Sequence, residues 1–101
     1  MESLNKILDT SFVSGLSRDP KDVALKVGEE SGELQSAILY NEPMENVVNE
    51  TADIIISSVD CAFIYARNKG FITKENFISL LEDSISKKVD KWYKKYVENL
   101  E

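Results

Sequence analysis

The stretch that decides the fold runs from residue 43 to residue 69 and reads PMENVVNETADIIISSVDCAFIYARNK. On a helical wheel at about 100° per residue, its apolar side chains cover about 200° of arc. A surface helix needs an apolar face only a little wider than about 100°, so we expect a helix buried on most sides, at the centre of an assembly. The remaining sector is a polar stripe, spaced three or four residues apart. It comprises Asn46, Glu50, Asp53, Ser57 and Asp60.

Residues that typically begin or end helices indicate where the other helices lie. Asp19-Pro20 is typical of an N-cap followed by proline at the first helical position, and Thr73 is a second N-cap. Gly70 indicates a helix end, and residues 41–43 a break and restart. No segment alternates polar and apolar residues as a strand does over more than a few residues. The predicted fold is an all-α, four-helix single domain over residues 1–101, with helices at 2–16, 20–40, 43–69 and 73–99.

The composition of the 101 residues argues against several classes of protein. Lys and Arg number 12 against 18 Asp and Glu, and a net charge of −6 disfavours nucleic acid or an anionic membrane as a partner. Histidine is absent and Cys61 is the single cysteine, which excludes His-based and Cys₄ zinc sites and suits the cytoplasm. No apolar run reaches the roughly 18 residues of a membrane span. An enzyme of this composition works with carboxylates, lysines, hydroxyls or a hard metal ion.

Two carboxylate pairs lie on the two central predicted helices. Glu30 and Glu33 are three residues apart in the second helix, and Glu50 and Asp53 are three apart in the third. Two like charges about 6 Å apart repel by about 3 kcal/mol at an effective dielectric of about 20. Four such acids need Lys or Arg partners or a hard dication such as Mg²⁺, which prefers oxygen ligands and keeps sites for water and phosphate. The competing interpretation is a stripe of acids that faces solvent.

Residues 26–34 read KVGEESGEL, and residues 50–55 read ETADII. This EExxE motif, followed after a short loop by ExxD, resembles the all-α nucleoside triphosphate pyrophosphohydrolases of the MazG type over roughly residues 20–70. The resemblance implies hydrolysis of the α–β phosphoanhydride of a nucleoside or deoxynucleoside triphosphate, giving the monophosphate and pyrophosphate. It also implies Mg²⁺ as the cofactor, with Mn²⁺ as a substitute. The implied metal ligands are Glu30, Glu33, Glu50 and Asp53.

The same resemblance gives roles to single residues. Glu30 or Glu33 would accept the proton of the attacking water, and the sequence does not choose between them. Lys26, one turn before Glu30, would contact phosphate or form a salt bridge with Glu30. Members of the family supply basic groups and an Asn from the C-terminal helix, and Asp90 stands here where that Asn is expected. The basic residues expected to bind substrate there are Lys88 and Lys91.

A second subunit is expected to complete the bundle. A helix that is apolar over about 200° is difficult to bury with three partners from one short chain. The family resemblance likewise implies a homodimer or a homotetramer. Gly28 and Gly32, four residues apart on one side of the second helix, are expected to let another helix approach closely.

Two alternative functions remain open. Residues 26–30, KVGEE, also resemble phosphoribosyl-ATP pyrophosphohydrolase, although no His follows the ExxD helix, where that enzyme commonly has one. The other alternative is a non-catalytic helical interaction module, in which the acids are exposed and their replacement by Ala changes little.

Overall fold

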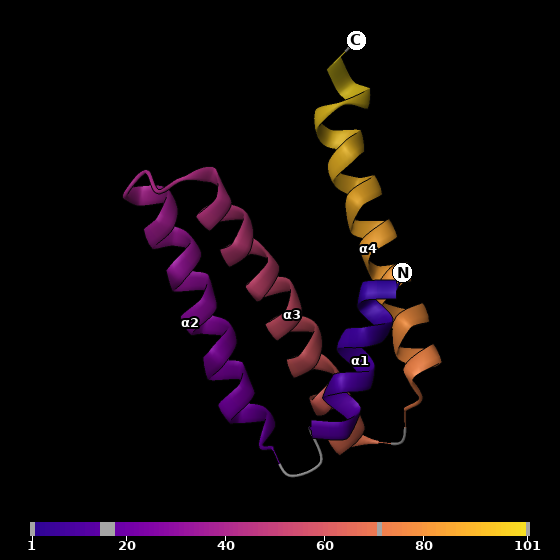
Figure 1. Ribbon diagram of the computed structural model, residues 1–101. Coiled ribbons are helices and arrows are strands. Elements are labelled where there is room, and N and C mark those ends of the chain that lie inside the picture. Colours follow the sequence, from indigo (N-terminus) through magenta and orange to yellow (C-terminus); the bar gives the residue numbers. More distant parts are fainter. Residues whose placement is uncertain (1, 15–17, 71, 101) are drawn as a thin grey trace. The chain divides into compact units, whose positions relative to one another are not determined.

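The computed structural model describes residues 2–14, 18–70 and 72–100, and those residues form helices and short connections with no strand (Figure 1). The α-helices are α1 (Glu2–Ser14), α2 (Pro20–Leu39), α3 (Met44–Lys69) and α4 (Lys74–Tyr96), and a short 3₁₀ helix, η1 (Glu98–Leu100), follows α4. They belong to two compact units. Met1–Phe71 contains α1, α2 and α3, and Ile72–Glu101 contains α4 and η1. The predicted all-α class with four α-helices is therefore confirmed for the described residues.

The caps predicted from the sequence begin two of the helices. Asp19 is extended, and its carboxylate accepts a hydrogen bond of 2.9 Å from the backbone N–H of Lys21. Pro20 follows at the first position of α2, where its missing N–H costs nothing. The Thr73 hydroxyl accepts a hydrogen bond of 3.1 Å from the backbone N–H of Asn76 and so begins α4. Local side-chain chemistry thus sets these helix starts.

The predicted helix ends need small corrections. Pro43 and Thr73 were included in the predicted helices, but both adopt extended backbone and precede α3 and α4 as caps. The second predicted helix ends at Leu39 rather than residue 40. The fourth ends at Tyr96 rather than residue 99, because the last residues tighten into the 3₁₀ helix η1. Residues 15 and 16 of the first predicted helix lie outside the described residues.

A short turn at residues 40–43 reverses the chain between α2 and α3. Asn41 adopts φ 52°, in the left-handed region that Asn enters more readily than most residues. The N–H of Asn41 donates to the carbonyl of Ile38 at 3.2 Å, and the N–H of Glu42 donates to the carbonyl of Ala37 at 2.9 Å. This pair of bonds is a Schellman motif, which satisfies the last carbonyls of α2 and starts the return of the chain.

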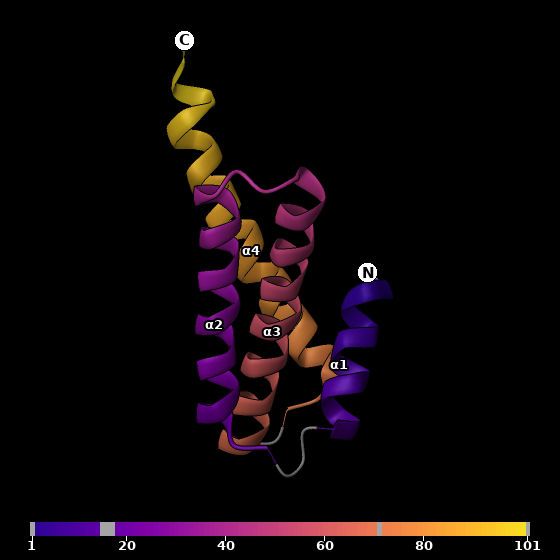
Figure 2. The same cartoon turned by 60° about the vertical axis from the view of Figure 1, so that its left-hand side comes forward.

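The helices of the first unit pack through one apolar face each. α2 and α3 lie side by side and antiparallel, and α1 packs against α3 (Figure 1, Figure 2). Near the end of α3, the Arg67 guanidinium lies over the Phe12 ring, 4.2 Å from its centroid, and donates to the Phe12 carbonyl at 3.4 Å. The buried apolar side chains of this unit are Leu4, Leu8, Val23, Ala37, Phe63 and Ile64.

Within the first unit, α3 is covered on fewer sides than its sequence predicts. Val48, Ile55 and Ile56 remain 56%, 55% and 48% exposed, because α1 and α2 cover only part of its surface. Neither α1 nor α3 approaches Gly28 or Gly32 closely, and the approach of another helix there stays a prediction. A Cβ added at either glycine would meet no atom within 4 Å. Within the first unit, α1 and α2 therefore leave part of the apolar surface of α3 exposed.

The second unit is an amphipathic helix. The apolar residues of α4 recur three or four positions apart, as the sequence predicts. Along the C-terminal half of α4 this stripe is exposed. For example, Ile85 is 52% exposed and Trp92 is 68% exposed. Near the end of α4, the Lys95 ammonium lies over the ring of Tyr96. In the first unit, the Lys69 ammonium at the end of α3 lies over the ring of Tyr65 in the same way.

Candidate metal centre

The polar stripe predicted on α3 lies opposite a second stripe on α2. Because the two helices are antiparallel neighbours, residues late in α2 lie across from residues early in α3. Each stripe repeats at intervals of three or four residues, and so each runs along one side of its helix. The α2 stripe comprises Asp22, Lys26, Glu30 and Glu33, and the α3 stripe comprises Glu50, Asp53, Ser57 and Asp60.

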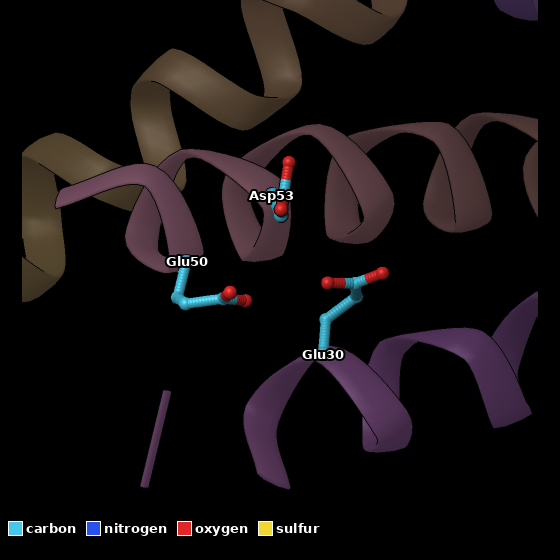
Figure 3. Close-up of side chains that lie close together, drawn as sticks. All are labelled: Glu30, Glu50 and Asp53. Carbon is cyan, nitrogen blue, oxygen red and sulfur yellow. The ribbon is translucent and has the colours of Figure 1, made fainter. Parts of the chain in front are cut away.

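Three carboxylates meet between these helices (Figure 3). Glu30 of α2 and Glu50 and Asp53 of α3 each contribute one oxygen, and the three oxygens lie within 4.8 Å of one another. Glu30 and Glu50 extend into the space between the two helices, as Figure 3 shows. Glu30 is buried, Glu50 is half-buried and Asp53 is exposed. Three of the four ligands inferred from the motif are therefore neighbours in space.

Two of these carboxylates have an oxygen that is buried and lacks a hydrogen-bond partner. These atoms are Oε2 of Glu30 and Oε2 of Glu50. Leaving a buried acceptor unsatisfied costs about 1–3 kcal/mol, and more when the acceptor is charged. Ligand oxygens of one Mg²⁺ lie about 2.1 Å from the ion, so no two of them are more than about 4 Å apart. The donor atoms are therefore of the kind that a hard divalent cation takes, and their 4.8 Å spacing is slightly wider than the span of one Mg²⁺ ligand shell.

One lysine compensates part of this negative charge. The Nζ atom of Lys26 lies 3.1 Å from Oε1 of Glu30, one turn further along α2. The hydrogen bond to Glu30, together with the charges of Glu29 and Glu30, raises the pKa of Lys26. Of the two roles predicted for Lys26, the structure has the salt bridge, and contact with phosphate stays a prediction. A single lysine leaves the carboxylate cluster with an excess of negative charge.

Glu33 lies at the exposed edge of the cluster. The charge of the Glu30 carboxylate, followed by the interaction with Glu50, raises the pKa of Glu33. Removing the proton from Glu33 places another negative charge beside two carboxylates that already repel each other. A bound dication would reverse this effect and favour the ionised form. Glu33 is thus an exposed acid of the cluster, as Asp53 is, and without a metal ion it holds a proton more tightly than usual.

Nothing in the sequence pointed to Arg18, which pairs with Asp60 at the other end of the α3 stripe. Its Nη1 and Nη2 atoms each donate to one carboxylate oxygen of Asp60 at 2.9 Å. Its Nε and Nη2 atoms also donate to the carbonyl and hydroxyl of Ser14, both at 3.2 Å. This two-pronged contact ties the connection before α2 to α3. The partners are 42 residues apart in the chain, and no spacing rule joins them.

The two substrate-binding lysines predicted in the C-terminal helix lie in the other unit. Lys88 and Lys91 are exposed on α4. They are one turn apart, on the same side of that helix. Their contact with substrate stays a prediction.

Comparison with known proteins identifies no family for this chain. No family model, no curated protein and no solved structure matches it. The MazG resemblance therefore depends on the EExxE and ExxD motifs. In the part of the chain that the structure describes, every helix is too short or too polar to cross a membrane.

Proposed function

We propose that this chain is a Mg²⁺-dependent nucleoside triphosphate pyrophosphohydrolase of the MazG type. The observation that carries the proposal is the pair of buried carboxylate oxygens, one on Glu30 and one on Glu50, that have no hydrogen-bond partner. They belong to a cluster whose oxygens lie within 4.8 Å of one another. A protein whose acids serve only solubility does not bury them in this way. A cytoplasmic location, where Mg²⁺ and nucleotides are both abundant, suits such an activity.

The cluster supplies an oxygen-rich site of the kind that Mg²⁺ prefers. Glu30, Glu50 and Asp53 would hold the ion, and Glu33 would join them at the exposed edge. Mg²⁺, or Mn²⁺ in its place, would neutralise phosphate charge and make a nearby water more acidic. The remaining ligand positions would stay open to water and to phosphate oxygens.

Glu33 is the better of the two candidates for general base. Glu30 is buried and holds Lys26 through one oxygen, whereas Glu33 is exposed to the solvent from which the attacking water comes. With Mg²⁺ bound, the Glu33 carboxylate would be ionised and ready to accept a proton. The water oxygen bonds to phosphorus, the α–β bridging P–O bond breaks, and the proton passes to the Glu33 carboxylate. The products are the nucleoside monophosphate and pyrophosphate.

Lysines would neutralise the part of the triphosphate that the metal ion does not reach. The side chain of Lys26 is 55% exposed and lies at the border of the acid cluster, so its ammonium can meet a phosphate without leaving Glu30. Lys88 and Lys91 would supply further positive charge from α4. This assignment predicts a higher KM for a Lys26→Gln variant.

The complete enzyme is proposed to be a homodimer or a homotetramer. The support is the apolar surface of α3 that α1 and α2 leave exposed, including Val48, Ile55 and Ile56. Exposed apolar surface is often used for protein interfaces. Light scattering at micromolar concentration is expected to give at least twice the mass of one chain. A monomeric mass would contradict the oligomer.

The activity is tested by incubating the protein with Mg²⁺ and a panel of ribo- and deoxyribonucleoside triphosphates. Pyrophosphate is expected as the primary product, and its release should stop in EDTA and fall at least about 100-fold in Glu50→Gln. Glu45→Gln, an exposed acid in the first turn of the same helix, is the matched control and should retain activity. Orthophosphate as the primary product would mean that a different bond is cut.

A non-catalytic interaction module is the second candidate, favoured by the exposed apolar stripe of α4. Trp92 in that stripe is 68% exposed. The module predicts no hydrolysis with any triphosphate and no effect of Glu50→Gln on its interactions. Hydrolysis of phosphoribosyl-ATP alone would instead favour the related histidine-pathway enzyme.

A further inference from the structure

A cavity of about 550 Å³ lies between α2 and α3, beside the acid cluster. Small-molecule sites in proteins commonly measure about 300–1,000 Å³, so the cavity has room for a nucleoside. Its walls combine apolar and polar side chains. Val23 and Ile56 offer apolar surface, and the polar groups around them are Arg18, Asp19, Asp22, Lys26, Ser57 and Asp60.

The cavity is displaced from the proposed metal site by about one helical turn along both helices. On α2, Lys26 lines the cavity and also holds Glu30 at 3.1 Å. On α3, Ser57 lines the cavity one turn after Asp53. One helical turn is about 5.4 Å long. This length is similar to the distance that the sugar of a nucleotide puts between its base and its phosphates. A triphosphate held at the acids would therefore direct its nucleoside into this cavity.

The charge of the cavity suits a nucleoside better than phosphate. Asp19, Asp22 and Asp60 line it together with Arg18 and Lys26, so carboxylates outnumber cations. Both cations already bind carboxylates, Arg18 at 2.9 Å and Lys26 at 3.1 Å. A phosphate group would meet net negative charge there, whereas an uncharged nucleoside would not.

The carboxylates of the cavity supply hydrogen-bond acceptors, and so they favour ligand groups that donate hydrogen bonds. An ionised carboxylate accepts hydrogen bonds only, through about four lone-pair positions. Arg18 uses one position on each oxygen of Asp60, which leaves both oxygens able to accept another bond. Asp22 offers a further acceptor from the first turn of α2. The cavity is therefore rich in acceptors.

We propose that this cavity binds the nucleoside part of the substrate and that Asp22 and Asp60 recognise its hydrogen-bond donors. The donors are an exocyclic amino group of the base or a hydroxyl of the sugar. The inference rests on the proposed function, because it assumes that the phosphates bind at the acid cluster. It assigns the choice of nucleotide to residues that lie outside the metal site.

Binding is tested first without metal or hydrolysis. Cytidine and uridine differ by an amino group and a carbonyl, and 2′-deoxycytidine lacks one sugar hydroxyl. Each is titrated in EDTA into ¹⁵N-labelled protein, and amide shifts are followed by NMR. Cytidine is expected to shift the amides of Val23 and Ser57 and to bind about 10- to 100-fold more tightly than the analogue lacking the recognised donor, as for a hydrogen bond to a charged group.

Specificity is then tested by kcat/KM for pyrophosphate release from CTP, UTP and dCTP with Mg²⁺. Asp22 is exposed, and its replacement in Asp22→Asn keeps the side-chain size but adds a donor. The variant is expected to lower the CTP-to-UTP ratio, or the CTP-to-dCTP ratio, at least about fivefold. Asp83→Asn, an exposed aspartate on α4, is the matched control and should change neither ratio.

The outcomes separate the two proposals. A change in the first ratio supports recognition of the base amine, and a change in the second supports recognition of the sugar hydroxyl. Hydrolysis with both ratios near one, or with ratios that Asp22→Asn leaves unchanged, overturns the nucleoside assignment and leaves the pyrophosphohydrolase standing. Nucleoside binding in this cavity without hydrolysis of any triphosphate overturns the proposed function instead. Shifts confined to other regions overturn the assignment of the cavity.

Discussion

Replacing Glu50 by Gln is expected to stabilise the metal-free protein and to abolish its stabilisation by Mg²⁺. Glu50 and Glu30 bring carboxylate oxygens within 4.8 Å of each other, and Lys26 pairs with only one of these residues. Glutamine keeps the size of the side chain and removes its charge. It also adds an N–H donor beside the buried Glu30 oxygen that has no partner.

The magnitude follows from the separation of the two charges. At 4.8 Å, two negative charges repel by about 3 kcal/mol at an effective dielectric of about 20, and by about 1 kcal/mol at that of water. Glu50 is half-buried, so the gain in unfolding free energy should fall between these limits. For a domain of this size, 1 kcal/mol corresponds to about 4–8 °C in Tm.

Thermal unfolding, followed by circular dichroism at low salt, measures both parts of this prediction. In EDTA, Glu50→Gln should melt above the wild type. With Mg²⁺ at about 100 times its Kd, the wild type should gain about 2.7 kcal/mol and the variant almost nothing, so the order reverses. Glu45→Gln, in the first turn of α3, should lose a few tenths of a kcal/mol in both buffers, because it removes a favourable charge from a helix N-terminus.

Two results would refute the reasoning. The first is a Glu50→Gln variant that melts below the wild type in EDTA, which would mean that the carboxylates do not repel one another in the folded protein. The second is an equal gain from Mg²⁺ in both proteins, which would place the ion away from Glu50.

Three other substitutions test separate features. Arg18→Gln should lower the unfolding free energy in urea by about 1–3 kcal/mol, because Asp60 loses its two-pronged partner; unchanged stability would contradict that role. In EDTA, unfolding free energy should fall as pH rises from about 4.3 through the higher folded-state pKa of Glu33, since the folded state there binds a proton that the unfolded state has released. Glu33→Gln should remove this slope, and a rise in stability over the same interval would show the opposite sign. Leu8→Ala should cost about 2–4 kcal/mol, because Leu8 is fully buried; a loss under about 1 kcal/mol would mean that the site collapses readily.

The helix starts were accessible from the sequence to within one residue, because they depend on neighbouring residues. Asp19 and Thr73 cap through contacts two or three residues away, and their side chains are typical of that role. The meeting of Glu30 with Glu50 was also accessible, because a short turn between two helices forces them to lie antiparallel.

Features that depend on distant packing were not accessible. The pairing of Arg18 with Asp60 links residues 42 positions apart. The apolar arc of α3 predicts a helix covered on most sides, but periodicity does not say which helices cover it or whether they belong to the same chain. Ile55 therefore stays 55% exposed in a helix that its sequence predicts to be enclosed.

The turn at residues 40–43 and the start of α3 would respond differently to a change in chain length. A residue inserted into α3 before Glu50 would rotate Glu50 and Asp53 by about 100° about the helix axis and shift them by about 1.5 Å relative to the turn. One such insertion would carry both acids away from Glu30 while leaving every motif intact. An insertion beside Asn41, in the turn itself, would instead enlarge a surface loop and leave the acids aligned.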